Sequence, residues 1–172
     1  MTTEALKQAA RPLSKPCGSV AALASACARG DAASLFAQID RQAADVLAHT
    51  LCTINRLDEP QLRLQRLYSS NPEAYPPGGR KDKAGTSWGR HVLQERQIFI
   101  GEGLQAIAQS FDDHDAIAAL GLRSVINVPV VFEGSCLGTV NFLMTSERVR
   151  EEHVEAARWS ALMALPGFLM RV

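Results

Sequence analysis

The residues with side chains able to bind or transform a small molecule gather between positions 68 and 99. They are Tyr68, Tyr75, Arg80, Trp88, Arg90 and His91. Much of this stretch, 69–87, is rich in Pro, Gly, Ser and Asn, which indicates a long loop. Aromatic and cationic side chains on a loop, rather than in a regular element, are typical of a lid over a concave site. We therefore predict a binding pocket beneath this segment.

Each of these candidates also has a structural interpretation. Trp88 could anchor a short helix in the core, and Tyr75 could lie flat on the surface. His91 shares a helix face with Trp88 and could bond a loop carbonyl instead of a ligand. As ligand contacts, His91 would be a pH-sensitive donor, and Arg80 and Arg90 would pair with an anionic group. No serine, cysteine or carboxylate is visibly paired with His91, so we expect no catalytic residues.

Two asparagines interrupt otherwise apolar strands, Asn127 in 124–132 and Asn141 in 136–144. A buried amide without partners costs about 1–3 kcal/mol. A three-residue turn over 133–135 would place the two side chains opposite each other, whereas a two-residue turn would put them on different faces. Opposed asparagines would either bond each other or reach a ligand. The predicted ligand contacts are Tyr75, Arg80, Trp88, Arg90, His91, Phe99, Asn127 and Asn141.

Two charged runs favour structural interpretations. Asp82 interrupts the basic run over 80–83, which is typical of a solvated loop. The acidic run over 112–115 suits the start of a helix, where carboxylates meet the positive end of the helix dipole. Consecutive side chains cannot all point one way, so we predict no metal site there.

The four cysteines are Cys17, Cys27, Cys52 and Cys136. None belongs to a CxxC pair or has metal-ligand spacing to a histidine, which argues against a structural zinc site. Cys52 and Cys136 lie in apolar, strand-like runs, where a buried free thiol is the usual state. Free thiols fit a reducing compartment, so we expect a cytoplasmic protein.

Composition limits the classes of partner. A chain of 172 residues suits one domain with an appendage, and its 47% hydrophobic content supports a proper core. Lys and Arg total 18, as do Asp and Glu, which gives no electrostatic reason to expect nucleic acid or an anionic membrane as a partner. No stretch approaches the roughly 20 apolar residues that cross a bilayer.

Hydrophobic periodicity predicts helices at both ends of a set of strands. Asp31 is a good N-cap for an amphipathic helix, and a second helix starts near Val149. Between them the pattern predicts a hairpin over 51–68, a helix over 88–97, a short strand over 98–100, helical turns over 102–120 and a hairpin over 124–144. Hairpins favour an antiparallel sheet, and the two terminal helices can pack on one of its faces.

This order, together with LGLRSVINVPVVFEGSCLGTVNFL over 120–143, resembles the GAF domain family. The matching positions are Gly121, Ser124, Pro129, Gly134 and Gly138. The resemblance covers residues 35–172 and leaves 1–34 as an N-terminal extension, partly helical or flexible. It implies an α+β, profilin-like fold. A five- or six-stranded antiparallel sheet would carry terminal helices on one face and a pocket covered by loops and short helices on the other.

GAF domains typically sense small molecules and commonly dimerise through their terminal helices. The resemblance therefore implies a regulatory, non-enzymatic protein without its own output domain, acting as a homodimer or on a separate effector, with an unknown ligand or cofactor. The Asn-Lys-Phe-Asp-Glu motif of cyclic-nucleotide-binding members is absent. No cysteine lies between Cys52 and Cys136, which counts against bilin attachment. Two alternatives remain: a thiol enzyme similar to free methionine sulfoxide reductases, in which Cys17 or Cys27 would reach the pocket, and a scaffold module with a vestigial pocket.

Overall fold

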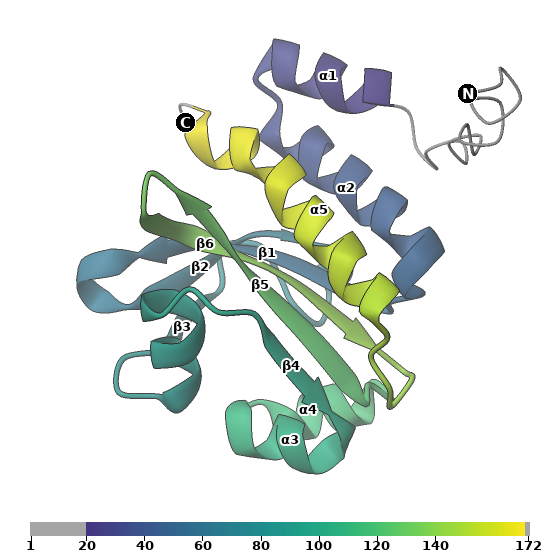
Figure 1. Ribbon diagram of the computed structural model, residues 1–172, viewed down its shortest axis with the longest axis vertical. Helices are drawn as coiled ribbons and strands as arrows, with labels where there is room; N and C mark the ends of the chain where they lie inside the picture. The colour runs from purple at the N-terminus through teal and green to yellow at the C-terminus, as the bar shows by residue number, and fades with distance from the viewer. Residues whose placement is uncertain (1–19, 171–172) are drawn as a thin grey trace, which may run out of the picture.

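A six-stranded antiparallel sheet in the order β3-β2-β1-β6-β5-β4 forms the centre of the computed structural model, which describes residues 20–170 (Figure 1). The strands are β1 (Leu51–Asp58), β2 (Arg63–Ser69), β3 (Arg80–Asp82), β4 (Phe99–Glu102), β5 (Ser124–Phe132) and β6 (Ser135–Met144). Both predicted hairpins are present, as β1–β2 and β5–β6. The short helix η1 (Glu59–Gln61), with Pro60 near its start, makes the first turn.

Two long helices cover one face of the sheet. Asp31 caps α2 (Ala32–Leu47) by accepting a hydrogen bond from the Ser34 amide at 3.0 Å. The second helix, α5 (Glu151–Leu169), lies beside α2 across the strands (Figure 1). Their shared core with the sheet contains Leu35, Phe36, Ile39, Ile54, Ile126, Val140, Phe142, Ala157 and Phe168. Within residues 20–170, no helix is both long enough and apolar enough to pass through a bilayer.

The region predicted as an N-terminal extension contains regular structure that packs on the domain. Helix α1 (Val20–Arg29) buries Leu23 and Ala26 in the same core as α2 and α5. The predicted boundary between residues 34 and 35 falls inside α2. Residues 1–19, including Cys17, lie outside the described part of the chain.

The opposite face of the sheet is covered by shorter elements. A π-helical segment, η2 (Gly89–Gln94), precedes β4, and α3 (Gly103–Ser110) and α4 (His114–Ala119) follow it. Figure 1 shows α3 and α4 at the far end of the sheet from α1. The structure therefore has the predicted α+β arrangement with six strands, helices on one face and a loop-covered second face. The loop over 69–87 contributes β3, a strand that its polar sequence did not predict.

A polar cluster joins α2 to the sheet. Both oxygens of the Asp40 carboxylate accept hydrogen bonds, from His49 Nε2 at 2.6 Å and from the Tyr68 hydroxyl at 2.7 Å. Asp40, His49 and Cys52 bring one potential metal-ligand atom each within 4.8 Å of one another. Burial raises the pKa of the Cys52 thiol well above its ordinary value, which keeps it protonated and a poor ligand. We therefore assign this cluster a structural role.

Candidate functional site

A cavity of about 60 Å³ lies on the loop-covered face of the sheet, opposite α2 and α5. Its floor is formed by side chains from the four inner strands β2, β1, β6 and β5, and its roof by β3, the loop around Tyr75, the segment before η2, and the α3–α4 region. The lining residues are Leu51, Thr53, Asn55, Leu64, Arg66, Tyr75, Lys81, Lys83, Trp88, Phe111, Asp113, Ile117, Val125, Asn127, Asn141 and Leu143. Four of the eight predicted contact residues are in this set: Tyr75, Trp88, Asn127 and Asn141.

The two asparagines face each other across β5 and β6, although the turn between these strands has only two residues. Glu133 and Gly134 have φ values of 48° and 76°, as the twisted two-residue hairpin turns require. That turn alone would offset the asparagines, but a bulge intervenes: Val131 pairs with Cys136, whereas Val130 pairs with Gly138. The extra residue restores the opposed register of Asn127 and Asn141, which the simple turn-length rule did not predict.

The asparagines bond each other as the middle of a buried hydrogen-bonded chain. Asn127 Nδ2 donates to Asn141 Oδ1 at 2.8 Å, and Asn127 Oδ1 accepts from Trp88 Nε1 at 2.9 Å. Asn141 Nδ2 reaches the Thr53 carbonyl and hydroxyl at 3.2 Å and the Thr139 hydroxyl at 3.1 Å. This chain fixes the Trp88 indole at the cavity wall, so Trp88 is both a core residue and a lining residue.

The π-helical turn explains why Trp88 and His91 do not share one environment. In η2 the Glu95 amide donates to the Arg90 carbonyl, five residues earlier, which widens the turn. Trp88 faces the cavity, while His91 is half-exposed and its Nε2 lies 3.1 Å from the Ile98 carbonyl oxygen. His91 therefore contacts a loop carbonyl, which is the structural interpretation given for it above as the alternative to ligand binding.

Three cationic side chains line the cavity: Arg66, Lys81 and Lys83. The expectation of a solvated loop over 80–83 is wrong for Lys83, whose exposed fraction is 4%. Because β3 pairs with β2, side-chain alternation turns Lys81, and Lys83 just beyond the strand, toward the cavity. Arg80 and Asp82 are exposed on the strand's other side.

The cationic side chains differ in how they are compensated. Lys81 Nζ lies 2.5 Å from Asp113 Oδ2. Burial alone would raise the pKa of Asp113, but the hydrogen bond and charge of Lys81 hold it below its ordinary value. Lys83 has no such partner among the described residues. Its Nζ lies 5.4 Å from the Trp88 ring centroid and 5.8 Å from that of Phe111, and burial lowers its pKa.

Tyr75 closes the same side of the cavity. The Arg66 guanidinium lies over its ring, 5.1 Å from the centroid. The Tyr75 hydroxyl is buried near the Asp113 carboxylate, without a hydrogen bond of normal geometry to it, and Arg66 Nε is buried without a partner. Burial, and then the nearby charge of Asp113, raises the pKa of Tyr75 to about 12, so the hydroxyl is a neutral donor.

The other four predicted contacts lie outside this cavity. Arg80 borders a shallow outer groove beside Tyr75, and Arg90 is exposed on η2. Phe99 packs behind the cavity wall, with its ring centroid 5.9 Å from that of Phe111. Neither Arg80 nor Arg90 lines the cavity, and Arg66 and Lys83 occupy the positions there that were expected for these two arginines.

The described cysteines also lie away from the cavity. Cys52 faces the α2 side of the sheet, and Cys136 packs against Leu64, Trp88 and Leu93 without lining the cavity. Burial raises the pKa of Cys136, as it does for Cys52. The expectation that Cys52 and Cys136 are buried free thiols is confirmed.

Replacing Lys83 by methionine is expected to raise the free energy of unfolding at pH 7 by about 1 kcal/mol, because methionine keeps the apolar stem and removes a largely desolvated ammonium that has no ion-pair partner among the described residues. The pKa of Lys83 is lowered in the folded state, so wild-type stability rises with pH between that pKa and the ordinary value of 10.5. The advantage of Lys83→Met should therefore shrink toward pH 10. Urea unfolding at pH 7 and pH 10 measures both effects. Arg80→Met, on the exposed side of β3, is the control, and a Lys83→Met protein less stable than wild type at pH 7 would contradict the assignment.

Comparison with solved structures identifies the fold as that of the GAF domains. Residues 122–287 of a methyl-accepting chemotaxis protein superpose with a TM-score of 0.66 at 19% identity, covering 86% of this chain and 94% of that one. The GAF domain of an Acinetobacter phosphoenolpyruvate-protein phosphotransferase gives 0.64 at 15% identity, covering 87% and 92%. A phycoerythrobilin-bound GAF domain from a cyanobacterial phytochrome gives 0.60 at 13% identity, covering 86% and 92%. At the level of sequence, no protein-family model and no curated protein matches.

Proposed function

We propose that this protein is a sensory GAF domain that binds a small molecule in the cavity between the central strands and the β3–η2 segment. The observation that carries the proposal is that the Lys83 ammonium, at a cavity with largely apolar walls, lies against the Trp88 ring and has no hydrogen bond or ion pair among the described residues. A largely buried cation without an acceptor is costly, and a bound ligand would supply one.

The size of the cavity supports a small ligand. Sites for drug-sized molecules occupy about 300–1,000 Å³, whereas this cavity has about 60 Å³. A phycoerythrobilin-bound relative shows that a GAF fold can hold a tetrapyrrole, but the side chains here leave too little room for one. We propose binding without catalysis, because the cavity is lined by no serine, cysteine or histidine of the described residues.

Trp88 gives a direct test of ligand binding. The sequence has two tryptophans, and Trp159 is exposed on α5, so a Trp159→Phe variant leaves Trp88 as the single reporter. Small-molecule fractions of a cell extract should change Trp88 emission and raise the melting temperature together. An Asn71→Ala variant, altered outside the cavity, should respond equally. Melting temperature and emission that stay constant across all fractions would argue for the scaffold alternative.

We further propose a cytoplasmic homodimer formed through α5, with a separate effector as the second candidate for this surface. Trp159, Leu162 and Leu169 are 61%, 59% and 50% exposed and form one stripe of the helix at spacings of three and seven. Val131, exposed on β5, lines a groove together with Arg158 and Leu162 of α5, so the apolar surface continues onto the sheet. The free thiols Cys27, Cys52 and Cys136 support a reducing compartment.

Replacing Leu162 by glutamate should convert the dimer to a monomer, because a symmetric interface would bury the new charge twice. Light scattering after size-exclusion chromatography measures the change in mass. Leu104→Glu, at a 43% exposed position on α3, is the matched control and should leave the mass unchanged. A wild-type protein that is monomeric at all concentrations would exclude the dimer and leave the effector as the occupant.

A further inference from the structure

The charge inside the cavity is unbalanced. Arg66, Lys81 and Lys83 line it together with one carboxylate, that of Asp113. Lys81 already holds that carboxylate at 2.5 Å, so Arg66 and Lys83 remain without an anionic partner among the described residues. Their exposed fractions are 9% and 4%. The charges of Asp112 and Asp113 act on these cations from a distance, but neither cation is in direct contact with a carboxylate of the described residues. Buried charges in proteins are normally paired, so two cations without a direct partner at one cavity favour an anion as the missing partner.

Lys83 is the stronger of the two anion-binding groups. No hydrogen bond or ion pair of its ammonium is present within residues 20–170, and the ammonium lies against the faces of Trp88 and Phe111. Contact with aromatic faces offsets part of the desolvation of a cation but satisfies none of its three N–H donors. A bound oxyanion would accept those donors in a low-dielectric site, where a charge-assisted hydrogen bond is strong.

Arg66 and Tyr75 line the same cavity. Arg66 Nη1 donates to the Pro76 carbonyl at 3.0 Å, which holds the guanidinium against the Tyr75 ring, while Nε is left unpartnered. An added Cβ at the neighbouring Gly79 would lie 2.8 Å from Arg66 Nη1, so a larger residue there would displace the end of the arginine side chain. The hydrogen bond to Pro76 and the contact with the Tyr75 ring orient the Arg66 guanidinium beside the cavity.

The remaining lining limits the size and character of the anion. A volume of about 60 Å³ holds roughly four water molecules, whereas an engineered cavity that binds benzene has about 150 Å³. The walls around the cationic groups are apolar, with Leu51, Ile117, Val125 and Leu143 among them. An anion that suits this site has few heavy atoms, one charged end and a short apolar end.

We infer that the cavity binds a small aliphatic monocarboxylate of two to four carbons, with its carboxylate held by Lys83 and Arg66. This inference rests on the proposed function, since it names the ligand class of the same site. Lys83 confers selectivity for a negative charge, and the apolar wall selects a carboxylate with a hydrocarbon tail over a fully hydrated inorganic anion.

Calorimetric titration with acetate, propionate and butyrate tests the inference, with propionamide as the neutral isostere and sulfate as the inorganic anion. Wild type should bind at least one carboxylate at least tenfold more tightly than propionamide or sulfate. Lys83→Met should weaken that binding at least tenfold, while Arg80→Met, three residues earlier and exposed, should bind like wild type. Thermal unfolding of each variant without ligand checks that it is folded.

Each remaining outcome contradicts the inference in a different way. Equal binding of propionamide, or binding of propionate by Lys83→Met at wild-type strength, would overturn the role of charge and leave a small-molecule sensor intact. Binding of sulfate alone would show a site for inorganic anions. If none of the three carboxylates binds at about 10 mM while Trp88 emission still responds to a cell-extract fraction, the ligand class is rejected. If Trp88 emission does not respond to any extract fraction either, the proposed function is rejected.

Discussion

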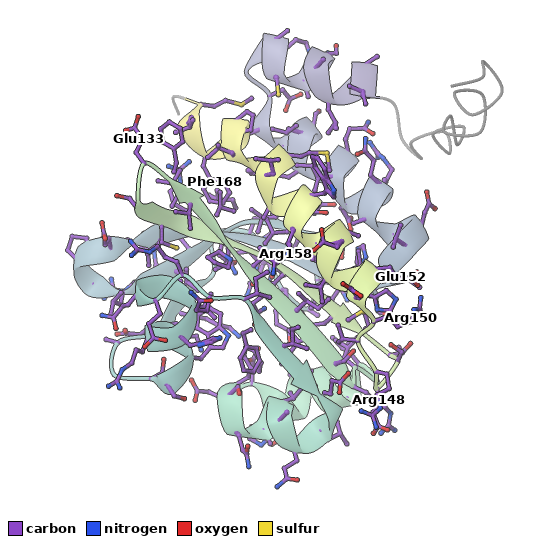
Figure 2. All side chains as sticks on the ribbon, viewed as in Figure 1. Glu133, Arg148, Arg150, Glu152, Arg158 and Phe168 are labelled. Carbon is purple, nitrogen blue, oxygen red and sulfur yellow. The ribbon has the colours of Figure 1, made fainter. Side chains whose placement is uncertain are left out.

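Replacement of Gly138 by alanine should lower the free energy of unfolding by about 3 kcal/mol, among the largest single-residue effects expected in this protein. An added Cβ would lie 2.0 Å from the Asn55 carbonyl oxygen of the neighbouring strand and 2.6 Å from Cε1 of Phe168. Neither neighbour can retreat easily, since Asn55 belongs to the central strand β1 and Phe168 is buried in the core. Figure 2 shows Phe168 at the end of α5, beside the β5–β6 hairpin.

The matched control for this prediction is Gly78→Ala. Gly78 has φ of +84°, but an added Cβ there meets nothing within 4 Å. The control therefore measures the cost of the backbone conformation alone, about 1 kcal/mol. Chemical unfolding of both variants separates the steric cost at Gly138 from the cost of the backbone conformation. An equal decrease in the free energy of unfolding in the two variants would show that the close approach at Gly138 is not a constraint.

Replacement of Asn141 by leucine should cost about 2 kcal/mol and disturb the cavity. Asn141 is buried and accepts one hydrogen bond from Asn127 while donating to Thr53 and Thr139. Its loss leaves Asn127 Nδ2 without an acceptor inside the sheet, and a buried donor without a partner costs more than a hydrogen bond contributes. Because Asn127 also holds the Trp88 indole, the emission of Trp88 in a Trp159→Phe background should shift.

Asn55→Leu provides the comparison for Asn141→Leu. Asn55 lines the same cavity, but the hydrogen bond of its side chain, from Nδ2 to the Thr139 hydroxyl, is long at 3.5 Å. This variant should lose less than 1 kcal/mol and keep the Trp88 spectrum. If both variants unfold at the same urea concentration, the buried chain from Trp88 to Thr53 contributes no special stability.

The elements predicted correctly are those with a strong hydrophobic period. Both hairpins, the capped helix after Asp31 and the terminal helix near Val149 combine apolar alternation or a helical stripe with a clear turn or cap. Packing of the two long helices together follows from those stripes.

The features missed by sequence reasoning depend on tertiary contacts. Strand β3 is three polar residues, whose backbone pairing with β2 has no hydrophobic signal. Without β3, nothing indicated that Lys81 and Lys83 face a cavity, while Arg80 looked equally suited to bind an anion. The spacing of two between Lys81 and Lys83 was the available signal, since alternate residues of a strand share a face.

The register of Asn127 and Asn141 shows a second limit. Turn length and strand pairing offered two outcomes, and the structure combines a two-residue turn with a bulge that restores the opposed arrangement. A bulge has only a weak sequence signal, here the glycine at 138 inside a strand. The hydrogen bond from Trp88 that completes the network joins residues 39 positions apart and could not be read from local pattern.

Native mass spectrometry of the freshly purified protein, compared with its denatured mass, tests the central claim that the cavity holds a small molecule. The expected result is an added small mass that disappears on denaturation and is lost from the Asn141→Leu variant. A species without added mass, combined with no thermal stabilisation by any small-molecule fraction of the cell extract, would contradict ligand binding and favour a scaffold role for this GAF fold.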